Sequence, residues 1–201
     1  MGRLAALLLA AALAAGCGGS KARIEKLEAN AVVLAFGDSL TFGTGAGPSE
    51  SYPAVLERGI GRKVVNAGVA GETSEQGLER LPEALDESKP RLLILCHGGN
   101  DFLQRLDDAK TAANVRAMIQ LARAKGVAVV LLATPRPGIP PSVPAFYAAI
   151  AAELGVPFED GAIRGVLLDN RLKSDLVHPN AAGYAQIAAA VEKTLRKSGA
   201  I

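Results

Sequence analysis

A serine follows a short apolar run in the stretch LAFGDSLTFG, residues 34–43. Ser39 has two interpretations. As a turn residue it needs only Gly37 for backbone freedom and Asp38 for local hydrogen bonds. As a nucleophile it needs a general base, a group that orients the base, and hydrogen-bond donors for an oxyanion. The choice therefore depends on what other parts of the chain supply.

Three further clusters contain residue types that nucleophilic catalysis requires. They are NAGVAG at 66–71, HGGND at 97–101 and DLVHP at 175–179. A serine hydroxyl is a poor nucleophile at neutral pH unless a base such as histidine takes its proton. Glycine backbone N–H groups and an asparagine amide can stabilise a developing oxyanion. Four such clusters would favour catalysis if the fold brings them together.

The helices and strands predicted between these clusters indicate that the fold brings the clusters together. Apolar runs predict five strands, at 31–36, 63–68, 91–96, 127–134 and 156–160. Amphipathic stretches predict the main helices, at 51–60, 73–88, 112–126, 145–155 and 181–199. Strands that are apolar on both faces and alternate with helices indicate an α/β fold, a three-layer α/β/α sandwich with a five-stranded parallel sheet. Three clusters directly follow predicted strands, where ligand sites of such sheets gather.

Composition narrows the function classes. The chain has 201 residues, of which 49% are apolar and 21% charged, as expected for one globular domain. A net charge of +2, without a basic run interleaved with aromatics, argues against a nucleic-acid partner. Aromatic residues make up only 4%, with no tryptophan, which disfavours a stacking surface for bases or sugars. Two cysteines are too few for a cysteine-based zinc site.

The N-terminus has the pattern of an export signal. Arg3 precedes an uninterrupted apolar run at 4–15, which is too short to span a bilayer comfortably. The following Ala-Gly-Cys resembles the lipobox of bacterial lipoproteins. We therefore expect residues 1–16 to be a lipoprotein signal peptide and Cys17 to be lipidated. The alternative is ordinary cleavage, with Cys17 as a bystander.

The lipoprotein interpretation also predicts how the chain is divided and where the protein is located in the cell. Residues 17–28 would be the lipidated cysteine and a polar tether, and residues 29–201 the folded domain. Acyl chains on Cys17 would anchor the protein to a membrane, so we expect an exported lipoprotein of the bacterial cell envelope. Cys96 would then have no disulfide partner within the chain. We expect the protein to be a monomer.

The segments GDSL, NAGVAG, GGND and DLVHP, in this order, resemble the motifs of the SGNH (GDSL) hydrolase family. Together they span residues 37–179. The segments GETSEQGLERLPEAL and LCHGGNDFL are most similar to the lysophospholipase/thioesterase/arylesterase branch. The resemblance implies the flavodoxin-like SGNH hydrolase fold and a serine esterase that requires no cofactor and no metal.

The same resemblance implies roles for individual residues. Ser39 would be the nucleophile, and His178 the base that takes its proton and later protonates the leaving group. Asp175 would orient the imidazole and stabilise its charged form. The oxyanion would be held by the backbone N–H groups of Ser39 and Gly71 and by the side-chain amide of Asn100.

His97 departs from the family's pattern, which usually has an apolar residue at this strand end. It could support the site, contact substrate, be a satisfied buried histidine, or act as an alternative base. We favour His178 as the base because Asp175 lies three residues before it, whereas only Asp101 is close to His97 in sequence. We also expect Asp101 to cap a helix, which leaves Asn100 free.

The sequence gives less support to three other functions. Cys96 and His97 could form a thiol nucleophile and its base, but adjacent side chains of a strand point to opposite faces. A binding lipoprotein without catalysis would be indicated by loss of Ser39, His178 or Asn100, and all three are present. A metal-dependent hydrolase would need four loosely spaced residues, namely His97, Asp101, Asp175 and His178.

The expected substrates are those that the resemblance implies: aryl esters, short-to-medium acyl esters, thioesters or lysophospholipids. A carbohydrate O-acetylesterase of the cell envelope is the enzymatic alternative. We expect the proline-rich loop at 134–144 to line the acyl pocket and to decide the chain length.

Overall fold

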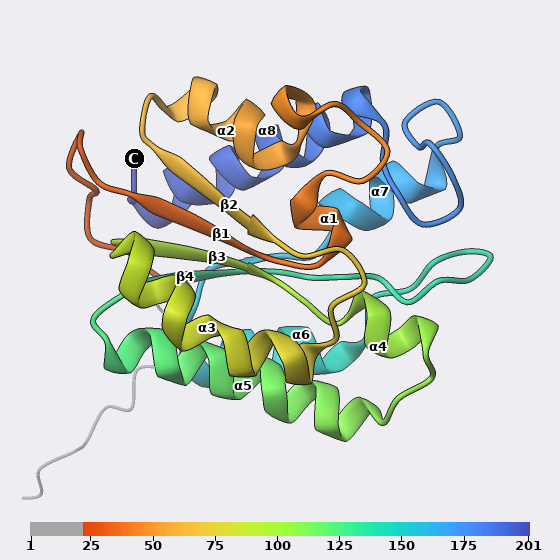
Figure 1. Cartoon of the computed structure of the whole chain (residues 1–201), viewed down its shortest axis with the longest axis horizontal. Helices are drawn as coiled ribbons and strands as arrows, with labels where there is room; N and C mark the ends of the chain where they lie inside the picture. The colour runs from red at the N-terminus through yellow and green to blue at the C-terminus, as the bar shows by residue number, and fades with distance from the viewer. Residues whose placement is uncertain (1–21) are drawn as a thin grey trace, which may run out of the picture.

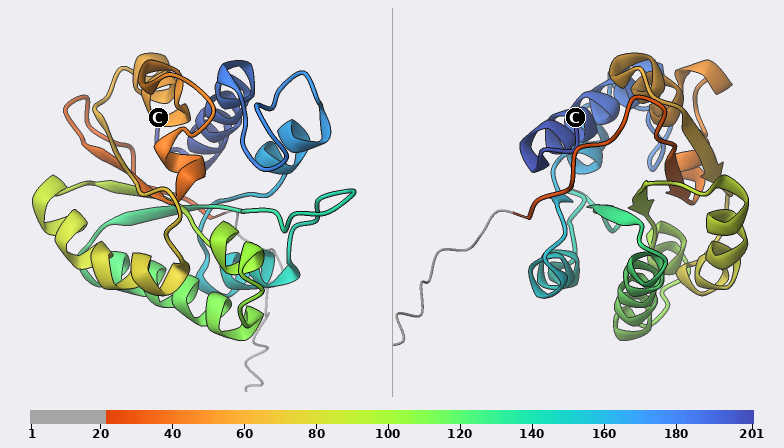
Figure 2. Two further views of the ribbon diagram at one scale, coloured as in Figure 1. Left: turned by 45° about the vertical axis from the view of Figure 1, so that its right-hand side comes forward. Right: turned by 90° about the vertical axis from the view of Figure 1, so that its left-hand side faces the viewer.

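A computed structural model describes residues 22–201, with a parallel sheet between two layers of helices (Figures 1 and 2). The predicted three-layer α/β/α domain is therefore confirmed. All five predicted strands are present, each somewhat shorter than its apolar run. They are β1 (Val33–Gly37), β2 (Val64–Gly68), β3 (Leu92–Cys96), β4 (Ala128–Leu132) and β5 (Phe158–Glu159).

The strand order is β2-β1-β3-β4-β5, which is the flavodoxin-like order. Gly37 pairs with Gly68 on one side and with Cys96 on the other, so β2, β1 and β3 end level with one another. The chain leaves β1 toward one side of the sheet and β3 toward the other. Ligands of such folds bind at this switch point, and the residues that follow β1 and β3 meet there.

Two apolar clusters fill the spaces between sheet and helices. One face of the sheet is covered by α2 (Tyr52–Ile60), α7 (Ala162–Leu168) and α8 (Ala181–Ser198). The other is covered by α3 (Ser74–Ser88), α5 (Asp108–Ala124) and α6 (Ala145–Leu154). Shorter helices at the loop-bearing edge are α1 (Ser39–Phe42), η1 (Pro48–Glu50) and α4 (Gly99–Leu103).

Local signals explain where these helices begin. The N–H of Thr73 donates to the Gln76 side chain at 3.0 Å, and the Thr73 hydroxyl accepts from the Gln76 N–H at 3.5 Å, forming the predicted capping box. Helix α5 begins at Asp108, four residues before the predicted start, because Asp107 caps it by accepting from the Ala109 N–H at 2.8 Å. That first turn is polar and lacks the apolar spacing on which the prediction depended.

The segment before β1 differs from the expected tether. Ile24 and Leu27 are buried against α8, and their N–H groups donate to the carbonyls of Ser198 at 3.0 Å and Ala200 at 2.8 Å. These apolar side chains join the core, so the folded domain begins before residue 29. The predicted signal peptide and Cys17 lie outside the described residues. Within residues 22–201, no helix is both long and apolar enough to cross a membrane.

Candidate active site

Ser39 lies where β1 turns sharply into α1. A Cβ on Gly37 would lie 2.0 Å from the carbonyl oxygen of Cys96, so only glycine fits beside β3 there. Asp38 is buried and accepts from the Leu40 N–H at 3.0 Å, which caps α1 as expected of a local turn residue. Ser39 is the first residue of α1, so its own N–H has no intrahelical acceptor.

His178 is held by a loop that its neighbours close. An antiparallel bridge joins Lys173 and Pro179, and the N–H of Ser174 donates to the His178 carbonyl at 2.9 Å. One carboxylate oxygen of Asp175 accepts from the backbone N–H of His178 at 2.8 Å. The other lies 2.8 Å from Nδ1 of the His178 ring. The three-residue spacing thus lets one carboxylate orient both backbone and imidazole.

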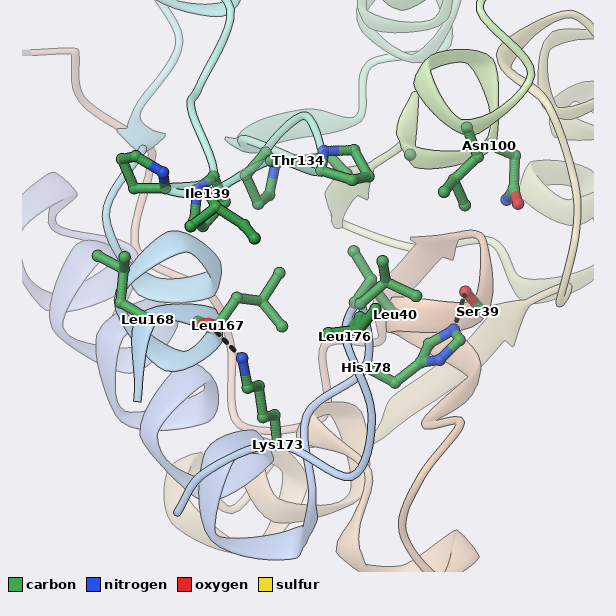
Figure 3. A pocket seen from close by; sticks show the side chains of 18 of the residues that line it. Ser39, Leu40, Asn100, Thr134, Ile139, Leu167, Leu168, Lys173, Leu176 and His178 are labelled. Carbon is green, nitrogen blue, oxygen red and sulfur yellow. Dashed lines mark hydrogen bonds between the residues drawn. The ribbon is translucent and has the colours of Figure 1, made fainter. Parts of the chain in front are cut away.

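Two segments far apart in the sequence meet at this point. Nε2 of His178 lies 3.1 Å from Oγ of Ser39, 139 residues away in sequence (Figure 3). Although burial raises the pKa of Asp175, hydrogen bonds from the His178 ring and two backbone N–H groups outweigh it and lower the pKa below its usual value. An ionised Asp175 only accepts hydrogen bonds, so Nδ1 carries the proton. The lone pair of Nε2 therefore faces the serine hydroxyl, as a general base requires.

The expected oxyanion donors come from two neighbouring segments. Asn100, in the first turn of α4, lines the same cavity as Ser39 and donates one Nδ2 hydrogen to the Glu72 carbonyl at 2.9 Å, which leaves the second hydrogen available. Gly71 has φ of +84°, which disfavours side chains, and its N–H has no acceptor within residues 22–201. Gly71 does not line the cavity itself.

A cavity of about 730 Å³ opens beside Ser39 and His178. Ser39 and His178 lie at one end, and Leu167, Leu168 and Lys173 at the other (Figure 3). The walls between them are mostly apolar. This volume lies within the roughly 300–1,000 Å³ of typical small-molecule sites.

Two segments supply most of the cavity walls away from Ser39. The proline-rich loop contributes residues 134–135 and 137–141, as expected, with Ile139 fully exposed at its tip. Helix α7 and Leu176 supply the facing wall, and the sequence analysis identified neither. Helix α7 is too short for a clear helical period, and only folding places it opposite the loop.

His97 does not line the cavity and is completely buried. Its Nε2 lies 3.0 Å from a carboxylate oxygen of Glu72, whereas its Nδ1 has no partner within the described chain. The carboxylate partner is thus 25 residues away, not the nearby Asp101. Cys96 is buried in the core of the opposite face, as strand alternation predicts, and burial raises the pKa of its thiol.

Asp101 does not cap its own helix, contrary to the sequence interpretation, since the N-cap of α4 is Gly98. The Asp101 carboxylate instead accepts from the backbone N–H of Ser74 at 2.8 Å, from its hydroxyl at 2.5 Å, and from the Thr111 hydroxyl at 3.1 Å. It therefore ties α4 to α3 and α5. In residues 22–201, no three His, Cys, Asp or Glu side chains form a set of potential metal ligands.

Fold and comparisons together define the class of protein: the chain is a carboxylic ester hydrolase. It belongs to the GDSL-like Lipase/Acylhydrolase family, whose sequence model matches residues 35–186. These bounds include Ser39 and His178 and most of the sheet. The family resemblance of the motifs is therefore confirmed.

Similar proteins agree with this assignment. The chain is 35% identical to Esterase TesA of Pseudomonas aeruginosa over 177 residues, which cover 82% of this chain and 87% of that one. It is 32% identical to Thioesterase 1/protease 1/lysophospholipase L1 of Escherichia coli K12 over 156 residues, or 74% of this chain and 75% of that one. The crystal structure of TesA superposes with a TM-score of 0.74 at 31% identity, covering 83% of this chain and 99% of that one.

Proposed function

We propose that this esterase acts through an acyl-enzyme on Ser39. The observation that carries the proposal is the continuous contact from Asp175 through His178 to Ser39, at 2.8 and 3.1 Å, beside the apolar cavity. Oγ of Ser39 attacks the ester carbonyl while its proton passes to Nε2 of His178. The imidazolium then protonates the departing alcohol, which leaves the acyl group on the serine.

The second half of the reaction, hydrolysis of the acyl-enzyme, returns the enzyme to its starting state. His178 takes a proton from water, and the resulting hydroxide attacks the acyl carbonyl, so that the carboxylic acid leaves and Ser39 recovers its proton. In both halves the oxyanion would accept from the N–H groups of Ser39 and Gly71 and from the amide of Asn100. Each such donor contributes about 3 kcal/mol to the transition state, or roughly two to three powers of ten in rate. Asp175 keeps the imidazole oriented throughout.

The cavity supports an acyl chain longer than acetate as the natural substrate group. An acetyl group would contact only the end near Ser39, whereas a longer chain could bury its methylenes along the apolar walls toward Leu168. Esters, thioesters or lysophospholipids with such chains fit this shape. A carbohydrate O-acetylesterase would leave most of the cavity unused.

A chain-length series tests this proposal. Burial of each methylene contributes about 0.8 kcal/mol, so kcat/KM for p-nitrophenyl esters should rise by up to about fourfold per added carbon until the cavity is filled. Leu168→Trp should lower kcat/KM for the longer esters much more than for the butyrate. A maximum at acetate, unchanged by Leu168→Trp, would instead support the O-acetylesterase.

We also propose that Cys17 anchors the protein to a membrane of the cell envelope. Helix α8 starts just after His178 and runs to Ser198, about 27 Å away at 1.5 Å per residue. Ile24 contacts the C-terminal end of α8. A lipid anchor on Cys17 would therefore attach the protein to the membrane by the side of the domain that lies opposite Ser39 and His178. The cavity mouth would then face away from the anchoring membrane.

Cys17→Ser should release the protein from the membrane. Without a thiol to acylate, the exported chain would lack the hydrocarbon that holds it, and should move to the soluble fraction after cell lysis. Fractionation followed by immunodetection, with mass spectrometry of the N-terminal peptide, measures both partitioning and acylation. Continued membrane partitioning of the variant would refute the anchor, and Cys96→Ser is the matched control that should leave partitioning unchanged.

A further inference from the structure

A buried ionic cluster lies behind the expected oxyanion donors and has no role in the chemistry described so far. The Glu72 carboxylate accepts from Nε of Arg80 at 2.6 Å and from Nη2 of Arg80 at 2.7 Å. Its Oε2 also lies 3.0 Å from Nε2 of His97. These residues come from the β2–α3 turn, α3 and the end of β3, so the cluster ties three segments together.

Glu72 is also joined to the segments that carry Gly71 and Asn100. It directly follows Gly71, and its N–H donates to the Val69 carbonyl at 3.3 Å, so Glu72 closes the turn that carries the Gly71 N–H. Its carbonyl accepts from Nδ2 of Asn100 at 2.9 Å, which directs the second hydrogen of that amide. A movement of Glu72 would therefore displace both donors together.

The cluster holds Glu72 firmly. Although burial raises the pKa of Glu72, hydrogen bonds from Arg80 and His97 outweigh it and lower the pKa to about 2. Glu72 is thus a carboxylate throughout the neutral range. Arg80 is fixed in turn, because its Nη2 donates to the Ala67 carbonyl at 3.0 Å and its guanidinium lies 4.1 Å above the Phe36 ring.

His97 completes the cluster from the sheet side. Since an ionised carboxylate only accepts, Nε2 of His97 carries a hydrogen and donates it to Glu72. The ring fits against α3 because residue 77 is glycine, where a Cβ would lie 2.3 Å from Nε2. Its Nδ1 is buried without a partner in the described chain, which is unfavourable for stability. An apolar residue would avoid that penalty, so the imidazole is poorly explained by packing alone.

From these contacts we infer that Glu72 and His97 are positioning residues, which hold the Gly71 N–H and the Asn100 amide in the geometry that an oxyanion requires. The inference rests on the proposed oxyanion role of those two donors. Neither Glu72 nor His97 touches the substrate. Each acts through the backbone and carbonyl of residue 72.

Paired substitutions at His97 test whether its donor is what matters. His97→Leu removes the donor, and should lower kcat on p-nitrophenyl butyrate by about 10- to 100-fold while KM stays within about twofold. His97→Gln can still donate to Glu72 and should retain kcat within about threefold of the unmodified enzyme. Thermal unfolding of both variants shows whether they remain folded. Equal kcat for the two variants would overturn the role of His97.

A double-mutant cycle separates positioning from mere stabilisation. Glu72→Gln should lower kcat by about 100-fold in the unmodified enzyme, and by at least about fivefold less in the N100A background, because one donor it positions is already absent. Glu153→Gln is the matched control. It breaks the surface Glu153–Arg116 pair, 2.9 Å long, and should leave kcat unchanged.

The possible outcomes are distinct. Equal losses from Glu72→Gln with and without Asn100 would show that the cluster only supports the fold, and would overturn the inference. If Glu72→Gln does not fold, the His97→Leu loss is measured in the same two backgrounds and decides in the same way. Failure of the proposed function is a separate result, because Ser39→Ala would then leave turnover intact whatever the cycle gives.

Discussion

Ser39→Ala is expected to lower kcat for ester hydrolysis by about six powers of ten. In the proposed mechanism the Oγ atom is both the attacking nucleophile and the atom that carries the acyl group, and alanine supplies neither. Within residues 22–201 the Oγ has one hydrogen bond, to His178, so its removal should leave the fold intact. The circular dichroism spectrum and the unfolding midpoint should therefore stay close to those of the unmodified protein.

A covalent probe checks the same residue without turnover. A fluorophosphonate should label the unmodified enzyme once, on the peptide that contains Ser39, because phosphonylation uses the same nucleophile and base. Ser39→Ala should not be labelled. Ser88→Ala is a suitable control, since the Ser88 hydroxyl donates to the Ala84 carbonyl within α3. Retained turnover, or labelling of another serine, would contradict the assignment.

The second large effect is expected at His178. His178→Ala should lower kcat by about five to six powers of ten, because without the imidazole nothing 3.1 Å from Ser39 can accept its proton. Asp175→Asn should cost less, about two to three powers of ten, since the carboxylate is 53% exposed and water screens its charge. Both losses of activity are checked by measuring kcat and KM of the two variants on one p-nitrophenyl ester.

Two comparisons sharpen this result. The double variant S39A/H178A should be no slower than Ser39→Ala alone, because nucleophile and base act as one unit. His97→Leu should lose far less activity than His178→Ala, because His97 faces Glu72 and does not line the cavity. The reverse order of the two histidine variants would identify His97 as the base.

Much of this protein could be predicted from local patterns. Strands buried on both faces, alternating with amphipathic helices, implied the parallel sheet. Strands β1 and β3 end at the start of polar clusters, and β2 ends within one. The Asp175–His178 contact was foreseeable because the two residues are three positions apart in one loop, and such a contact needs no long-range folding. The order of the motifs also predicted the family, which the match of the family model confirms.

The starts of the domain and of α5 were less predictable, because a contact with another helix sets the first and a polar cap sets the second. Ile24 and Leu27 lie in a polar stretch that resembles a tether, yet they bury against α8. Helix α5 starts early because Asp107 caps a turn without apolar spacing. In the first case the free energy comes from a contact with a distant helix, and in the second from a polar cap that apolar spacing does not reveal.

The sequence by itself determined the order of elements, the chemical groups at the strand ends and the family, because each depends on residues that are neighbours along the chain. Only the tertiary structure decided what surrounds those groups. It paired His97 with Glu72, turned Asp101 toward Ser74, and set α7 opposite the proline-rich loop to form the cavity. Such contacts join residues tens of positions apart, and their geometry exists only once the helices pack on the sheet.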